Sequence, residues 1–432
     1  MKIPEILVIE VDRAPGSLAR VLQVVGEAGL SVESLESIHR TQDKTTWELT
    51  LEMDEDMDQS LFERINALPV ANLVGISDRV FNRHVGGKIK TVSKVALNTP
   101  QILRDMYTPG VARVCLAIRD NPELVREYTS IGETVAIVTN GTAVLGLGDT
   151  GPQAALPVME GKAALFHTLV GISGVPVLID SKDPATVVET VAHIAPSFGA
   201  IQLEDIAAPA CFEIEDALVG RLDIPVIHDD QHGTAVVVLT ALMNATRIAG
   251  MDLGASTVGQ VGLGAAGIGI SRLLLKYGVK RLLGSDLKEE ELARLEAMGG
   301  ERGTLPELME NCDIVIGTTG VKGLIAPEMV RKGQLILSLT NPDPEIEPEV
   351  ALKAGAVFAA DGKSINNVSA FPGLLRGALD AGARRFSDAM LFAASHCLAE
   401  HTPEGQLVPD PLDKSIHKAV SQAVSQAAQE AP

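Results

Sequence analysis

A glycine-rich turn between a strand and a helix constrains the fold of this chain more than any other feature. Thr257–Val261 has the apolar character of a buried strand, and the turn 262–267 (GLGAAG), with Ala265 and Ala266 inside it, follows at once. An apolar helix and a second strand at 280–284 come next. This order of elements predicts a dinucleotide-binding βαβ unit of the Rossmann type.

Each glycine of the turn has a physical role in such a unit. Gly262 permits the sharp turn, Gly264 lets the backbone approach a pyrophosphate, and Gly267 lets the helix lie close to the sheet. The following helix N-terminus favours phosphate charge. Asp286, after the second strand, would accept hydrogen bonds from the ribose 2′-hydroxyl and repel a 2′-phosphate. The pattern therefore favours NAD, while nearby lysines keep NADP open.

Two apolar strands each lead into a pair of acidic residues. One strand is followed at once by Glu204 and Asp205, and a later one by a histidine and then Asp229 and Asp230. Ligands of open α/β sheets bind beyond the carboxyl ends of the strands, so three of these acids can converge. Three oxygen ligands suit Mg²⁺ or Mn²⁺ and leave positions for substrate and water. The alternative is that the acids are solvated helix caps.

A lysine and a tyrosine are candidates for proton transfer. Lys162 lies in the apolar segment 156–166 (LPVMEGKAALF), where Pro157 predicts a helix start. In an early helical turn, burial, the positive helix end and a nearby cation would all lower the pKa of this lysine towards that of a general base. The alternative is an ordinary surface lysine. Tyr107 lies in a Pro-Gly turn before a helix, where packing is the alternative to chemistry.

The chain divides by pattern into four parts. Residues 1–80 have the βαββαβ order of a ferredoxin-like α+β domain. Residues 81–235 begin with a basic linker and continue as an α/β region, and residues 236–400 form a second α/β region around the glycine-rich turn. Residues 401–432 are expected to be a helical tail.

A hairpin and an arm are predicted within these parts. The β-rich runs 135–139 and 143–147 flank Asn140-Gly141, the strongest short-range hairpin signal. An alanine-rich helix is expected over 415–428, and we expect it to pack as an arm in an oligomer.

Charge and cysteine usage restrict the partners and the compartment. The sequence has 36 basic and 56 acidic side chains, a net charge of −20, which repels nucleic acid and anionic membrane surfaces. The four cysteines form no CxxC pair, which argues against a disulfide framework or a thiolate zinc site. The sequence has neither a signal-peptide pattern nor an apolar stretch long enough to span a membrane. We therefore expect a cytoplasmic protein that binds neither nucleic acid nor membrane.

The first turn of the N-terminal part resembles that of ACT domains. Asp12, Pro15 and Gly16 fall in the pattern D-x-x-P-G-x-L, and Gly29-Leu30-Ser31 follows the next helix. The resemblance implies a regulatory domain that pairs with a second copy and binds an amino acid or similar metabolite as effector near the turn. The alternative is a plain tight turn with a pre-set helix start.

Several segments together resemble the malic enzyme family. They are YTPGVA (107–112), PVMEGKAALF (157–166), EDIAAPACFEIE (204–215), HDDQHGTA (228–235), GLGAAGIG (262–269), TNPDPEI (340–346) and NNVSAFPGLLRGALD (366–380). They occur in the order and spacing of the family's shorter, bacterial-type members. The resemblance implies oxidative decarboxylation of malate to pyruvate with NAD or NADP and a divalent metal.

The resemblance also implies a role for each site residue. The implied metal ligands are Glu204, Asp205 and Asp230. Asp229 would hold Lys162, which takes the hydroxyl proton of malate, and Tyr107 would protonate C3 of the enol. The implied contacts to the substrate carboxylate and the cofactor are Asn341 and Asn367, with Asn366 as the alternative to Asn367.

The sequence leaves three other functions to be considered. The same residues would serve a malolactic reaction, in which pyruvate is reduced to lactate before release. A metal-independent 2-hydroxy acid dehydrogenase is disfavoured by the two acidic pairs. A non-catalytic effector-binding protein is disfavoured by the intact candidate residues. The ACT-like turn and the tail helix both favour a homodimer or a larger homo-oligomer.

Overall fold

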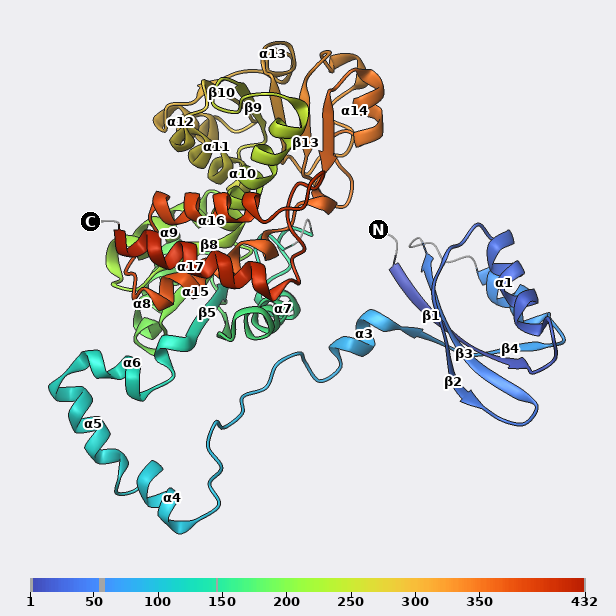
Figure 1. Ribbon diagram of the computed structural model, residues 1–432, viewed down its shortest axis with the longest axis horizontal. Helices are drawn as coiled ribbons and strands as arrows, with labels where there is room; N and C mark the ends of the chain where they lie inside the picture. The colour runs from blue at the N-terminus through green and yellow to red at the C-terminus, as the bar shows by residue number, and fades with distance from the viewer. Residues whose placement is uncertain (1–2, 54–58, 145–146, 431–432) are drawn as a thin grey trace. The chain divides into compact units, whose positions relative to one another are not determined.

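The N-terminal part of the computed structural model is an antiparallel sheet packed against two helices (Figure 1). Its elements are β1 (Ile3–Asp12), α1 (Ser17–Glu27), β2 (Val32–Arg40), β3 (Lys44–Met53), α2 (Gln59–Asn66), β4 (Ala71–Asp78) and α3 (Arg79–His84). The strand order is β2-β3-β1-β4. Alternate residues of β1, Leu7, Ile9 and Val11, face the helices and are buried with them. The βαββαβ order expected from the sequence is the order observed.

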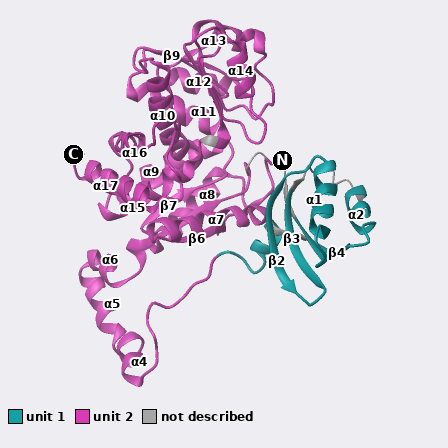
Figure 2. Cartoon of the chain, turned by 45° about the vertical axis from the view of Figure 1, so that its right-hand side comes forward, with its two compact units in different colours: residues 1–88 teal, residues 89–432 magenta. Residues whose placement is uncertain are grey.

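The structure describes residues 3–53, 59–144 and 147–430, which form two compact units (Figure 2). The first unit is residues 1–88 and the second is residues 89–432. Helix α3 belongs to the first unit, whose end therefore lies a few residues beyond the boundary that the sequence pattern suggested.

The second unit begins with short helices and continues as a parallel sheet. The elements are α4 (Pro100–Met106), α5 (Val111–Asp120), α6 (Val125–Tyr128), β5 (Thr134–Thr139), α7 (Pro152–Val170), β6 (Ser173–Leu178), α8 (Pro184–Ile194), β7 (Ala200–Leu203), α9 (Ala210–Arg221), β8 (Val226–His228) and α10 (Asp229–Ala249). The strand order is β6-β5-β7-β8, with all pairs parallel. Both faces of a parallel sheet are covered, which agrees with the apolar strands.

The hairpin predicted at Asn140-Gly141 is wrong. β5 pairs in parallel with β6 on one edge and β7 on the other, so neither edge can take an antiparallel partner. The described residues of 143–147 form no strand, and residues 145–146 lie outside the described part of the chain. Gly141 has φ +67°, and its carbonyl oxygen accepts from the amides of Thr150 and Gly151. The turn therefore leads towards the start of α7.

The helix start predicted at Pro157 is also wrong. α7 begins at Pro152, the first-turn position that proline favours, and Pro157 lies in the helix interior. Lys162 consequently lies in the middle of the helix, where the positive helix end has little effect. It belongs to the buried face of α7, together with Met159 and Phe166.

A second parallel sheet holds the glycine-rich turn. Its elements are β9 (Thr257–Val261), α11 (Ala265–Tyr277), β10 (Arg281–Ser285), α12 (Glu289–Ala297), β11 (Glu301–Arg302), α13 (Leu305–Asn311), β12 (Ile314–Gly317), β13 (Leu335–Ser338), α14 (Pro348–Ala354) and β14 (Phe358–Asp361). The strand order β11-β10-β9-β12-β13-β14 is the 3-2-1-4-5-6 order of the doubly wound dinucleotide-binding fold. This confirms the expected Rossmann-type arrangement.

Three C-terminal helices pack against helices that flank the two sheets of the second unit. They are α15 (Phe371–Asp380), α16 (Asp388–Glu400) and α17 (Lys414–Glu430). α15 and α17 pack against α7, and α16 packs against α10 and α11. The expectation that the tail helix is an arm is wrong, because α17 packs against α15 and α16 of its own chain. A Cβ at Gly373 would lie 2.6 Å from Val420 Cγ1, so these helices approach closely. α10 also runs through residue 235, where the sequence pattern placed a boundary.

In the part of the chain that the structure describes, helices long and apolar enough to cross a membrane are absent.

Candidate active site

The acidic residues expected to converge meet at one edge of the first parallel sheet. β7 and β8 are neighbours, with Leu203 opposite His228, so the acids that follow leave the same edge. One carboxylate oxygen each from Glu204, Asp205 and Asp230 lies within 4.8 Å of the others. The amide of Asp205 donates to Asp230 Oδ2 at 3.0 Å. Asp205 has φ +53°, a left-handed conformation that costs energy for a residue with a side chain and is common at functional sites.

Lys162 reaches this cluster from the middle of α7. Its Nζ atom donates to Asp229 Oδ2 at 2.5 Å and lies 3.1 Å from Glu204 Oε1. It also lies 4.2 Å from the centre of the Phe371 ring, a cation–π contact. Asn367 Nδ2 donates to the same Asp229 oxygen at 2.9 Å. The ammonium group is therefore held in one position by groups from several segments.

The charges of the cluster are unbalanced. Burial favours the neutral form of Lys162, but the carboxylates of Asp229 and Glu204 outweigh it and hold the pKa above its ordinary value. The expectation of a lowered lysine pKa is therefore wrong for the chain by itself. Burial raises the pKa of Glu204 to about 7 and those of Asp229 and Asp230 to about 6, against the attraction of Lys162. Each carboxylate stabilises the charged form of the single ammonium group, but one positive charge cannot neutralise all three carboxylates. The cluster therefore lacks positive charge.

Three residues that the sequence interpretation missed shape this site. A Cβ at Gly233 would lie 1.9 Å from Asp229 Oδ1, so glycine leaves room for that carboxylate. Gln202 Nε2 donates to Glu204 Oε2 at 2.6 Å. Glu215 accepts from the amide of His228 and from Gln231 Nε2, each at 2.8 Å. A polar residue inside an apolar strand was a sequence signal for Gln202, whereas the role of Gly233 depends on the folded helix.

The asparagines expected near the substrate occupy different places. Asn367 contacts Asp229, whereas Asn366 Oδ1 accepts from the Val368 amide and starts a short helical turn. Asn341 follows β13, and its Nδ2 atom would lie 2.8 Å from a Cβ at Gly362. Of the two adjacent asparagines, Asn367 is therefore the one that lies in the cluster.

The glycine-rich turn has the geometry that its residues predict. Gly262 has φ +87°, and a Cβ there would lie 2.7 Å from Thr318 O. A Cβ at Gly267 would lie 1.9 Å from Gly262 O, whereas a Cβ at Gly264 would meet nothing within 4 Å. Glycine at 264 therefore leaves open space, as a closely approaching pyrophosphate requires. Ala265 and Ala266 begin α11, whose first amides face that space.

Two contacts place this turn relative to its surroundings. Asp286 Oδ2 accepts from the Leu263 amide at 2.7 Å, so the acid lies directly beside the turn. A Cβ at Gly269 would lie 2.4 Å from Gln231 O, which shows that α11 packs closely on the first turn of α10. Because that turn carries Asp229 and Asp230, the two predicted sites are neighbours.

Known proteins share both the sequence and the fold of this chain. Residues 86–219 match the family described as Malic enzyme, N-terminal domain. The NAD-dependent malic enzyme 1 of Bacillus subtilis is 50% identical over 416 residues, covering 96% of this chain and 95% of that protein.

The chain belongs to the malic enzyme family.

Other malic enzymes agree with this assignment. A bifunctional malic/malolactic enzyme of Bacillus subtilis is 41% identical, covering 80% of this chain and 90% of that protein. The crystal structure of malic enzyme from Pyrococcus horikoshii Ot3 superposes with a TM-score of 0.75 at 39% identity, covering 80% of this chain and 87% of the other.

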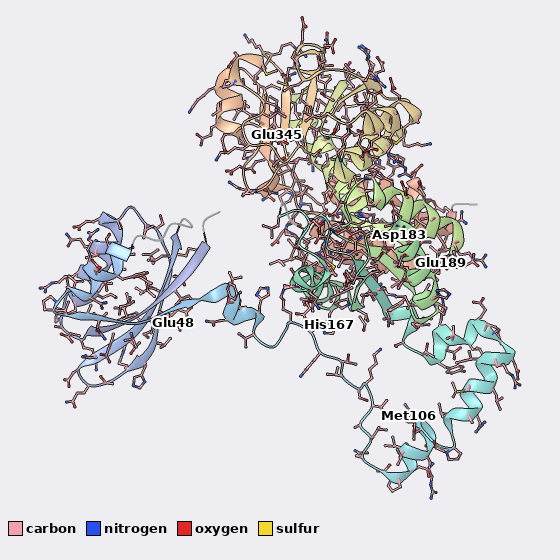
Figure 3. The ribbon with its side chains drawn as sticks, turned by 180° about the vertical axis from the view of Figure 1, so that it is seen from behind. Glu48, Met106, His167, Asp183, Glu189 and Glu345 are labelled. Atoms are coloured by element: carbon pink, nitrogen blue, oxygen red, sulfur yellow. The ribbon has the colours of Figure 1, made fainter. Side chains whose placement is uncertain are left out.

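Tyr107 lies apart from the cluster of Glu204, Asp205 and Asp230. Its side chain is 70% exposed, and neither α4 nor α5, which flank it, has a buried residue. Figure 3 shows its neighbour Met106 and His167, on the helix that carries Lys162, in different parts of the unit. The contacts of a single chain therefore do not bring Tyr107 to Lys162.

The N-terminal unit has a cavity of its own at the turn that resembles ACT domains. It has a volume of about 390 Å³, and its lining includes Asp12, Arg13, Pro15, Gly16, Arg40 and Trp47. Gly16 has φ +85° at the start of α1, a conformation that favours glycine. Arg13 Nη1 donates to the carbonyl oxygens of Thr41 and Gln42, which ties the turn to the β2–β3 connection.

Proposed function

We propose that this chain oxidises and decarboxylates malate to pyruvate and CO₂ while reducing NAD, with Mg²⁺ or Mn²⁺ as the metal. The observation that carries the proposal is the position of Lys162, buried against Asp229 and Glu204 beside a cluster of carboxylates. The relatives named as NAD-dependent malic enzymes support it.

Glu204, Asp205 and Asp230 would hold the metal. Their oxygens are the hard ligands that Mg²⁺ and Mn²⁺ prefer. The raised pKa values of Glu204 and Asp230 fit this role, because a cluster that lacks positive charge gains most from a cation. When bound, the metal supplies Lewis-acid polarisation of the substrate's hydroxyl and of the ketone formed from it.

Lys162 would take the proton of the substrate's C2 hydroxyl as hydride leaves C2 for the nicotinamide. Asp229, whose Oδ2 atom also accepts from Asn367 Nδ2, orients the Nζ atom of Lys162, and the Phe371 ring keeps water from one side. Burial already favours the neutral amine that a base requires. In the chain by itself the carboxylates raise the pKa of Lys162. A cation held among these acids would offset their negative charge and make the neutral amine accessible.

The dinucleotide would lie over the carboxyl edge of the second sheet. The pyrophosphate would approach Gly264 and accept from the first amides of α11, at Ala265 and Ala266. Asp286 would bind the ribose 2′-hydroxyl, which favours NAD over NADP. Asn341, after β13, would contact the nicotinamide side and the substrate.

The active form would be a homodimer in which Tyr107 serves the partner's site. α4 and α5 expose apolar side chains that a monomer leaves in water, among them Leu103, Met106 and Leu116. A second copy would cover them. Because Tyr107 lies on the same segment, that copy would also bring its hydroxyl to the Lys162 of the other chain, where it would protonate C3 of the enol.

The N-terminal unit would be an ACT-like regulatory domain. The cavity beside Asp12, Pro15 and Gly16 is large enough for an amino acid or a similar metabolite. The sheet β6-β5-β7-β8 with its helices would form the substrate/metal domain, and the six-stranded sheet around the glycine-rich turn would form the dinucleotide domain. An effector would show itself as a change in activity that is lost when residues lining the cavity are replaced.

The decisive assay follows absorbance at 340 nm with malate and Mn²⁺, supplying NAD or NADP, with and without EDTA, and measures pyruvate. Metal-dependent NADH formation with an equal amount of pyruvate is the expected result. Absence of reduction with either cofactor would reject the proposed activity.

A malolactic reaction is a second candidate, since a relative is named as a bifunctional malic/malolactic enzyme. In that reaction the cofactor is recycled on the enzyme, so lactate would accumulate from malate without net NADH. Measuring lactate and NADH in one sample separates the two activities.

A further inference from the structure

A buried carboxylate lies at the carboxyl edge of the six-stranded sheet, apart from the metal cluster. Glu345 follows β13 and is 0% exposed. Figure 3 labels it within the part of the unit that holds this sheet. Its side-chain partners in the described part of the chain are the hydroxyl and amide groups of two threonines. Burying a carboxylate against neutral groups costs free energy of folding, so its presence here calls for a structural or functional explanation.

The hydrogen bonds of Glu345 join two loops. Its Oε1 atom accepts from the Thr319 amide at 2.7 Å and the Thr319 hydroxyl at 2.9 Å, both after β12. The same oxygen accepts from the Thr340 hydroxyl, after β13, at 2.5 Å. Thr340 Oγ1 in turn accepts from the Gly320 amide at 2.9 Å. One carboxylate therefore fixes loop 318–320 against loop 339–341.

Gly317 leaves room for the Glu345 carboxylate, and Thr318 and Thr340 connect its contacts to neighbouring segments. A Cβ at Gly317, the last residue of β12, would lie 2.6 Å from Glu345 Cδ. Thr318 Oγ1 donates to Gly262 O at 3.0 Å, which connects loop 318–320 to the glycine-rich turn. On the other side Thr340 directly precedes Asn341. The contacts of Glu345 thus lie between the turn and the asparagine expected at the cofactor.

The strand order indicates which half of the dinucleotide meets these loops. Dinucleotides cross the sheet where the strand order reverses, here between β9 and β12. Asp286, after β10, lies on the adenosine side, so the nicotinamide half lies over β12 and β13. We propose that Glu345 is a positioning residue for the nicotinamide half of NAD, acting through loops 318–320 and 339–341. This inference rests on the proposed NAD-dependent function.

The test compares two ligands that differ in the nicotinamide. Calorimetric titration of the full chain with NADH and with ADP-ribose would be made for the unmodified protein and for Glu345→Ala. We expect NADH binding to weaken at least about tenfold, the factor that corresponds to one lost hydrogen bond to a charged group. ADP-ribose binding should change much less than NADH binding, because ADP-ribose lacks the nicotinamide that these loops would contact. Glu349→Ala is the matched control, since its side chain is 89% exposed.

Two further variants keep the test decisive if Glu345→Ala does not fold. Thr340→Val removes one hydroxyl donor with little change of shape, and it should weaken NADH binding selectively by a smaller factor. Glu345→Gln keeps an acceptor oxygen and should recover part of the loss. Equal weakening of both ligands, or no weakening of either, would overturn the positioning role. If the unmodified chain bound neither ligand, the proposed function would fall and this role with it.

Discussion

Replacing Gly264 or Gly267 by alanine should have opposite effects on the stability of the protein, but both replacements should weaken NAD binding. Gly264 has φ −65° and ψ −164°, which alanine adopts without strain, and its Cβ would meet nothing within 4 Å. Gly264→Ala should therefore keep or raise stability, by about 0.4–1 kcal/mol, because it restricts the unfolded chain. The added methyl group would occupy the space of the pyrophosphate, so NADH binding should weaken by roughly tenfold to a hundredfold, or about 1.4–2.8 kcal/mol.

Gly267→Ala should instead disturb the fold. Its Cβ would lie 1.9 Å from Gly262 O and 2.9 Å from the Gly262 carbonyl carbon, so backbone would have to move. Overpacking of this kind costs about 1–3 kcal/mol or more.

The assay is urea unfolding followed by circular dichroism, together with NADH titration of each variant. The expected pattern is an unchanged or higher midpoint for Gly264→Ala, a lower midpoint for Gly267→Ala, and weak NADH binding for both. Normal NADH affinity in Gly264→Ala would show that the pyrophosphate does not bind in the open space beside this glycine.

Three further predictions concern the metal, the dimer and the tail helix. Mn²⁺ at about 100 times its Kd should stabilise the protein by about 2.7 kcal/mol, and Glu204→Gln or EDTA should remove this gain; an equal gain in the variant would contradict the ligand assignment. Lys162→Ala and Tyr107→Phe should each lose about 10²–10⁴-fold in turnover. A dimer of one Lys162→Ala chain and one Tyr107→Phe chain should have about half of the unmodified activity if Tyr107 serves the partner's site, since one of its two symmetric sites is then intact. No recovery in such dimers would exclude that arrangement. Burial lowers the pKa of His417, against the hydrogen bond to the Pro411 carbonyl and the charge of Asp413, so the contribution of this side chain to stability should be lost as the pH drops below about 6.5. The carboxylates beside Lys162, whose pKa values are raised, act in the opposite sense over the same range, so the His417 contribution is measured as a difference between variants. The urea midpoint of His417→Asn, relative to that of the unmodified protein, should therefore rise as the pH falls through this range, and a difference that does not change with pH would show that His417 does not titrate with folding.

The local motifs were predictable because their signals act over adjacent residues. The turn 262–267 follows its strand and precedes its helix in sequence, so its conformation depends on neighbours a few residues away. The meeting of Glu204 with Asp230 was also predictable, since neighbouring parallel strands end at one edge. Family resemblance added the roles that spacing by itself left open.

The wrong local predictions came from signals that tertiary contacts override. Asn140-Gly141 has a strong hairpin pattern, but β5 lies inside its sheet and both of its edges are paired. Pro157 is a helix-start signal, yet an earlier proline begins α7 and packing keeps the helix intact beyond Pro157. The tail helix looked like an arm, but its apolar face is buried on its own chain.

The sequence by itself determined the class of fold, the dinucleotide turn and the acids that gather around Lys162. Only the tertiary structure decided how these groups influence one another. The pKa of Lys162 depends on carboxylates 42 and 67 residues away, whose opposing charges outweigh burial. The role of Glu345 likewise depends on two loops that meet only in the folded sheet. Electrostatic and packing effects follow distances in space, and the spacing of residues along the chain does not contain those distances.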